Sequence, residues 1–273
     1  CWQSTMKLDF IDAFITNHAF SGNPAAVVQH DAPISVELMQ AIAGQHNLSE
    51  TAFIMPIAGM PDHFQIRWFT PTVEVDLCGH ATLAAAYAVF MQSDIRQVTF
   101  HTQKHGNLPV ALRQEGLCMD FPVQPQRRMD NVPLQLLKCI PEQHSDAFFG
   151  ADWLVVYEDP EIVINATPDL IGLHRVPGRG LILTAPGMGE FDFVSRFFAP
   201  RCGINEDPVT GSAHCALAPY WSVRLGRQRV VGWQASKRGG VVTAEVSHGR
   251  VNLIGHCRLY SSSWIRPEAL GLA

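Results

Sequence analysis

Residues 76–86 read DLCGHATLAAA and residues 206–218 read EDPVTGSAHCALA, and these two stretches decide the expected fold. Each is a polar turn with a glycine that leads directly into a helix of small apolar residues. The first turn of such a helix presents backbone N–H groups that lack intrahelical partners, and the helix dipole favours an anion there. Two such helix starts in one chain predict one anionic ligand held between two halves.

The two stretches also form an internal repeat. Aligning Cys78 with Thr210, an offset of 132 residues (210 − 78 = 132), pairs small residues along both helices. The pairs are Gly79 with Gly211, Ala81 with Ala213, Ala84 with Ala216 and Ala86 with Ala218. Because the offset is close to half of the 273-residue chain, it predicts a duplicated domain.

A domain boundary is expected in the stretch FPVQPQRR, residues 121–128, which has the composition of a linker. The predicted N-terminal domain therefore comprises residues 6–122, completed by the C-terminal segment 259–273. The predicted C-terminal domain comprises residues 123–258. Met6 is a candidate translation start, which would leave residues 1–5 outside the native chain.

Composition excludes several classes of protein. The net charge is −5 and no cluster of lysine or arginine departs from it, so neither nucleic acid nor an anionic membrane is an expected partner. The seven cysteines contain no C-x-x-C pair, which argues against a disulfide framework and a zinc knuckle and favours a reducing cytoplasm. No run approaches the roughly 18 apolar residues of a membrane span, and the first residues lack the pattern of a signal peptide.

Short apolar runs bounded by Gly, Pro, Asn and Asp predict a sheet-rich protein with few helices. The expected strands are residues 8–14, 25–28, 64–69, 98–101, 110–112, 181–184, 241–246 and 251–254. The expected helices are residues 35–46, 79–91, 192–198 and 212–225, with Gly226 ending the last. The helices at 79–91 and 212–225 are almost free of charge, so each is expected to lie at the centre of its own sheet.

Glu50 is the candidate acid/base. It lies between the end of an expected helix and an apolar strand, where partial burial would raise its pKa towards the value that proton transfer near neutrality requires. The competing interpretation is a solvated loop glutamate.

The helix starts carry the other candidates. His80 either binds an anionic partner or serves as a capping or core histidine. Ser212 is a candidate N-cap of the helix at 212–225. Asp207, which precedes Pro208, is a candidate turn residue. Cys78 is placed where a helix dipole stabilises a thiolate, but its counterpart in the repeat is Thr210, which favours the interpretation of Cys78 as a small buried apolar residue over a catalytic thiol.

Metal and nucleotide sites are not expected. His101 and His105 are four residues apart, yet they lie at a strand end and turn, where that spacing does not place both rings on one face. The chain has neither a phosphate-binding P-loop nor a complete dinucleotide fingerprint.

Taken together, several segments resemble the phenazine-biosynthesis isomerase (PhzF-like) family, which is related to diaminopimelate epimerase. They occur in family order between residue 9 and about residue 255. These segments are DAF at 12–14, FSGNPAAV at 20–27, NLSETAF at 47–53, RWFTP at 67–71, CGHAT at 78–82, FAP at 198–200 and GINEDPVTGSAH at 203–214.

The resemblance implies an α+β fold of two similar domains, each a β-barrel around a central helix, with the site in the cleft between them. It also implies that Glu50 is the acid/base. His80, Asp207 and Ser212 would hold or polarise the substrate, and backbone N–H groups near Gly79 and Gly211 would bind its carboxylate. A homodimer is expected by the same resemblance.

Diaminopimelate epimerases use two cysteines at the positions of Cys78 and Thr210, and a threonine hydroxyl is too weak an acid to replace the second thiol. The leading hypothesis is therefore a cofactor-independent isomerase that moves a proton in a small carboxylic acid on one face. The alternatives are an amino-acid racemase or epimerase that uses Cys78, and a non-catalytic protein that binds a small acid.

Overall fold

The computed structural model describes residues 6–270. Residues 1–5, expected to precede the native start, and residues 271–273, expected to end the segment that completes the N-terminal domain, lie outside the described residues. The chain divides into two compact units. Within the described residues, the first unit comprises residues 6–15, 23–120 and 254–270, and the second comprises Thr16–Gly22 and Phe121–Leu253. The sequence predicts boundaries at 122 and 259, whereas this division falls after Asp120 and Leu253 and also assigns residues 16–22 to the second unit.

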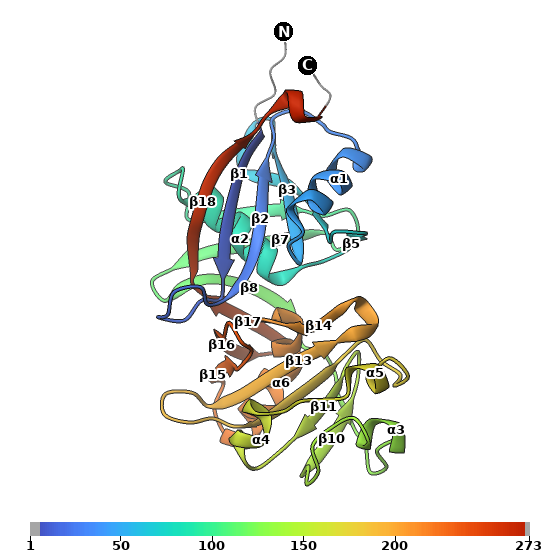
Figure 1. The fold of residues 1–273 in the computed structure, drawn as a ribbon. Helices are drawn as coiled ribbons and strands as arrows, with labels where there is room; N and C mark the ends of the chain where they lie inside the picture. Colours follow the sequence, from blue (N-terminus) through green and yellow to red (C-terminus); the bar gives the residue numbers. More distant parts are fainter. Residues whose placement is uncertain (1–5, 271–273) are drawn as a thin grey trace. The chain divides into compact units, whose positions relative to one another are not determined.

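The first unit is a sheet built around one helix. Its strands are β1 (Met6–Ala13), β2 (Asn23–Gln29), β3 (Glu50–Ile57), β4 (Met60–Phe69), β5 (Glu74–Val75), β6 (Gln97–His101), β7 (Asn107–Arg113), β8 (Gly116–Pro122) and β18 (Cys257–Ile265). Helix α2 (Gly79–Phe90) contacts β1, β2, β3, β7 and β18, and Figure 1 shows β18, β1 and β2 side by side. Helix α1 (Val36–His46) contacts β3 and β4, and the Ser35 hydroxyl caps it by accepting from the Leu38 N–H at 3.2 Å.

The second unit has one long helix and three short ones among the described residues. Its strands are β9 (Arg127–Arg128), β10 (Asp146–Phe149), β11 (Trp153–Val156), β12 (Leu181–Pro186), β13 (Phe193–Ala199), β14 (Ile204–Asp207), β15 (Arg229–Gln234), β16 (Gly240–Ser247) and β17 (Arg250–Gly255). Its helices are α3 (Leu134–Leu137), α4 (Pro160–Ile164), α5 (Leu170–Leu173) and α6 (Gly211–Leu225), and the 3₁₀ turns of the chain are Pro200–Cys202 and Pro267–Leu270. Helix α6 contacts β15 and β16.

The strand pairing of the first unit recurs in the second. In the first unit β2 is parallel to β3, β3 antiparallel to β4, β4 parallel to β6, and β6 antiparallel to β7. In the second unit β11 is parallel to β12, β12 antiparallel to β13, β13 parallel to β15, and β15 antiparallel to β16. The central helix follows the short strand β5 in one unit and β14 in the other. The topology therefore repeats in the way that the sequence offset predicts.

The two central helices also begin at equivalent residues. Cys78 is the N-cap of α2 and Thr210 is the N-cap of α6, both with extended backbone and neither with a side-chain capping hydrogen bond. Most residues of both helices are buried, as the absence of charge in their sequences predicts. Ser212, the predicted N-cap of α6, is instead the second residue of that helix, because the helix begins at Gly211.

The expected helix at 192–198 is wrong. These residues form β13, which pairs with β12 on one side and β15 on the other. Phe193, Val194, Phe197 and Phe198 are all buried, so apolar side chains project from both faces of a central strand. A strand covered on both faces loses its period of two, and periodicity alone cannot then distinguish it from a buried helix.

The segment expected as a linker is anchored to α6. Pro219 lies inside this helix and has no N–H to donate to the Cys215 carbonyl four residues earlier. That carbonyl accepts from the Gln124 N–H at 3.1 Å instead, and the Val123 N–H donates to Gly249 at 3.0 Å. Among the described helices, none is long and apolar enough to cross a membrane.

Candidate functional site

Glu50 lies at the beginning of β3, where that strand runs parallel to β2 with Glu50 opposite Ala25. Its side chain is only 12% exposed. Burial raises the pKa of Glu50, and hydrogen bonds from Ser49 and Cys78 offset part of that rise. The carboxyl group is therefore shifted towards the range in which it can both take up and return a proton near neutrality.

His80 faces Glu50 across a short gap, with Nε2 at 3.4 Å from Glu50 Oε2. Its other ring nitrogen, Nδ1, lies 3.2 Å from Asn23 Nδ2 and 3.4 Å from Cys78 Sγ. The Ser49 hydroxyl donates to Asn23 Oδ1 at 3.3 Å, which turns the amide NH₂ of Asn23 towards the ring. With Nδ1 as the acceptor, the neutral form of the imidazole carries its proton on Nε2, the nitrogen that lies 3.4 Å from Glu50 Oε2.

The same three side chains could hold a metal ion. One ligand atom each from Glu50, Cys78 and His80 lies within 4.8 Å of the others, and a glutamate, a cysteine and a histidine are ligands that zinc accepts. The other histidines considered in the sequence do not converge. His101 Nε2 lies 2.7 Å from Nδ1 of His63, whereas His105 lies in an exposed turn.

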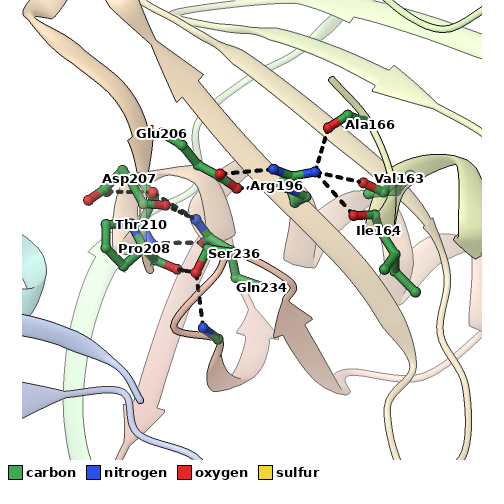
Figure 2. A network of polar contacts seen from close by, with 11 residues as sticks. Val163, Ile164, Ala166, Arg196, Glu206, Asp207, Pro208, Thr210, Gln234 and Ser236 are labelled. Carbon is green, nitrogen blue, oxygen red and sulfur yellow. Dashed lines mark hydrogen bonds and ion pairs between the residues drawn. The ribbon is translucent and has the colours of Figure 1, made fainter. Parts of the chain in front are cut away.

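In the second unit, Asp207 is held by a polar network at the start of α6 (Figure 2). The Thr210 hydroxyl donates to Asp207 Oδ2 at 2.6 Å and accepts from Gln234 Nε2 at 3.2 Å. Gln234 Nε2 also donates to the Asp207 carbonyl at 2.8 Å, and its Oε1 accepts from the Thr210 N–H at 2.9 Å. The Thr210 hydroxyl thus already donates one hydrogen bond and accepts another, which leaves it poorly suited to act as a second acid.

The residue before Asp207 belongs to a structural ion pair. Glu206 accepts two hydrogen bonds from Arg196, at 2.7 and 2.8 Å, and Arg196 Nη1 donates to the carbonyls of Ile164, the last residue of α4, and Ala166 (Figure 2). This arrangement fixes β14 at the strand residue that precedes Asp207. The hydroxyl of Ser236, which accepts from the Gly239 N–H, donates to the Pro208 carbonyl at 2.8 Å on the other side.

Ser212 has a charged neighbour that the sequence did not reveal. Its Oγ accepts from Arg179 Nη2 at 2.9 Å. Arg179 in turn donates from Nε and Nη2 to the two carboxylate oxygens of Asp152, at 2.9 and 2.5 Å. Asp152 is completely buried.

Each unit therefore assembles part of the predicted set by itself. The first unit brings Glu50 and His80 together at the start of α2, and the second gathers Asp207, Gly211 and Ser212 at the start of α6. Four residues that contact these side chains were not predicted from the sequence: Asn23, Ser49, Arg179 and Gln234. Asn23 and Ser49 do lie in the motifs FSGNPAAV and NLSETAF, but Arg179 and Gln234 come from segments in which no pattern marks them.

A cavity of about 660 Å³ lies in the second unit but contains none of the predicted site residues. Its walls come from the anchored segment after β8, from β10 and β11, and from the second half of α6 around Pro219 and Tyr220. It is therefore separate from the residues to which the sequence assigns chemistry.

Comparisons with known proteins agree with the pattern of motifs. The profile of the PhzC-PhzF family, described as phenazine biosynthesis-like protein, matches residues 11–261. A relative from Pseudomonas aeruginosa, named an uncharacterized isomerase, is 45% identical over 267 residues, which is 96% of this chain and 99% of the relative.

Solved structures extend the comparison to the fold. A phenazine biosynthesis protein of the PhzF family from Enterococcus faecalis is 38% identical, with a TM-score of 0.90 over 96% of this chain and 99% of that one. A hydroxyproline epimerase from Agrobacterium vitis, with bound trans-4-hydroxy-L-proline, is only 11% identical and has a TM-score of 0.57 over 99% of this chain and 96% of that one. This second likeness concerns the fold alone, and together the two structures confirm the predicted epimerase-like α+β fold.

Proposed function

The chain belongs to the PhzC-PhzF family and is an isomerase, and from this premise we propose that it moves a proton within a small carboxylic acid, with Glu50 as its single acid/base and without a cofactor. The observation that carries the proposal is the pair of Glu50 and His80. A largely buried carboxyl group with a raised pKa has an imidazole Nε2 at 3.4 Å.

In the proposed reaction the Glu50 carboxylate removes a proton from a carbon that is acidified by a neighbouring unsaturated or carboxyl group. The protonated Glu50 then returns the proton to another position on the same face. His80 donates from Nε2 to the charge that develops on the substrate. Only one acid/base group is needed, because the proton leaves and returns on the same side.

For the substrate, we propose that Gly79, Gly211 and Ser212 bind the carboxylate group and that Asp207 orients a reacting polar group. Support comes from the two equivalent helix starts, where backbone N–H groups favour an anion. That a single substrate lies between the two units, and that the protein is a homodimer, stay predictions from the family resemblance.

Solvent exchange tests the proposal. The protein is incubated in deuterated water with a panel of small unsaturated and α-acidic carboxylic acids, and deuterium uptake is followed by NMR. We expect Glu50→Gln to lower the exchange rate by roughly 10²–10⁴-fold, the range for loss of a general acid/base. Glu37→Gln, which makes the same change on the exposed surface of α1, is the matched control. Unchanged exchange in Glu50→Gln would remove Glu50 from the mechanism.

A racemase or epimerase that uses Cys78 is the second candidate. The observation in its favour is that the thiol lies 3.4 Å from His80 Nδ1 and donates a hydrogen bond to the Glu50 carboxylate. Loss of exchange in Cys78→Ala, together with inversion of a stereocentre by the wild type, would select this mechanism. The occupied hydroxyl of Thr210 speaks against it, because inversion needs a second proton donor on the opposite face.

A further inference from the structure

Arg179 lies where three elements of the second unit begin. It stands two residues before β12, Asp152 stands one residue before the parallel strand β11, and Ser212 is in the first turn of α6. The backbone holds this register, because the Arg179 N–H donates to the Ala151 carbonyl and the Trp153 N–H donates to the Gly180 carbonyl. The guanidinium group is therefore placed by the sheet itself.

Three contacts fix the orientation of the guanidinium plane. Both carboxylate oxygens of Asp152 accept from it, and its Cζ lies 5.4 Å from the centre of the Phe197 ring. Burial lowers the pKa of Arg179, but the hydrogen bond and charge of Asp152, together with smaller contributions that include Asp207, outweigh burial and raise the pKa overall. Arg179 is thus a permanent cation with a fixed geometry, and its side chain is still 39% exposed, whereas Asp152 is completely covered.

The hydrogen bond from Arg179 decides what Ser212 can do. Arginine has only donors, so the Ser212 oxygen must accept, and its hydroxyl proton remains available for another acceptor. Within residues 6–270 no acceptor takes this proton. A group bound beside Ser212 would therefore meet an O–H donor and a cation together, and a carboxylate oxygen satisfies both.

We propose that Arg179, held by Asp152, is a positioning and specificity residue that makes the Ser212 subsite selective for an anionic group. The inference rests on the proposed function in that the anion would be the carboxylate of the substrate. It goes further by assigning the selection to a charged pair that lies outside the family motifs.

Binding of benzoate and of its neutral analogue benzamide tests the proposal without turnover. Dissociation constants are measured by NMR titration of the whole protein. We expect the wild type to prefer benzoate. Removing Arg179 alone would leave the buried Asp152 carboxylate unpaired, so the main variant is Arg179→Gln with Asp152→Asn, which we expect to lose at least tenfold in benzoate affinity while benzamide changes little. Arg179→Lys, which keeps the charge but not the bidentate contact, should restore part of the preference.

The matched control is Arg229→Gln with Glu245→Gln, an ion pair on the surface of β15 and β16 that undergoes the same change of charge. It should bind both ligands like the wild type. A wild type without preference for benzoate, or an Arg179 variant that weakens both ligands equally or neither, would overturn the proposal. Glu50→Gln should still bind benzoate, so failure of the anion subsite and failure of the acid/base assignment give different results.

Discussion

Replacement of Gln234 by methionine should destabilise the second unit and disturb the start of α6. Gln234 is 1% exposed, and its amide makes three hydrogen bonds in the network of Figure 2. Methionine has a similar length and no amide, so the change removes these bonds without a large cavity. The Thr210 N–H and the Asp207 carbonyl would lose the partners that Gln234 provides, while the Thr210 hydroxyl would keep its bond to Asp207 Oδ2.

The size of the effect follows from these groups. Each of the two backbone groups that loses a buried partner costs roughly 1–3 kcal/mol, so the loss amounts to about 2–6 kcal/mol. Burial of the apolar methionine side chain returns roughly 1–2 kcal/mol. The expected decrease in the free energy of unfolding therefore has a central value of about 2.5 kcal/mol, within limits of about 0 and 5 kcal/mol.

Urea unfolding followed by tryptophan fluorescence measures this decrease. Gln228→Met is the matched control, because Gln228 is exposed at the turn before β15, and it should change the free energy of unfolding by less than about 0.5 kcal/mol. If Gln234→Met is as stable as this control, the buried amide does not carry the network and the reasoning is refuted. The same variant should also weaken substrate binding, because Asp207 loses its fixed backbone.

The remaining predictions concern the first unit. Because burial raises the folded-state pKa of Glu50, its contribution to stability is fully present below the unfolded pKa and is lost as pH rises through the folded value. Glu50→Gln should therefore be more thermostable than the wild type at pH 8, with an advantage that disappears towards pH 4.5, and a difference independent of pH would contradict the shift. Treatment with EDTA followed by dialysis should leave solvent exchange unchanged. Activity lost to the chelator and restored by Zn²⁺ would instead place a metal on Glu50, Cys78 and His80.

How much of the fold and of the candidate site could be predicted from the sequence depends on how far apart in the sequence the interacting residues lie. The two helix starts are local, since a glycine after a polar turn and a run of alanines determine both their position and their burial. The β13 strand was mistaken for a helix because the elements that cover its faces, α4 and α6, are not visible in its own residues. Arg179 and Gln234 were missed for a related reason, since their importance arises from partners 24 to 33 residues away.

The internal repeat predicts equivalent backbone positions in the two units, but it does not predict the side chains that surround them. His80 and Ser212 occupy equivalent places, each two residues after the N-cap (212 − 80 = 132), yet their surroundings differ completely. His80 meets a buried glutamate with a raised pKa, whereas Ser212 meets an arginine held by a buried aspartate. The first copy thus offers a group that can exchange protons, and the second offers fixed donors and a permanent charge. Since the backbones of the two helices begin in the same conformation, the chemical difference between the two helix starts must come from the side chains that the flanking strands contribute there. A duplicated backbone can therefore serve an asymmetric reaction without a second acid.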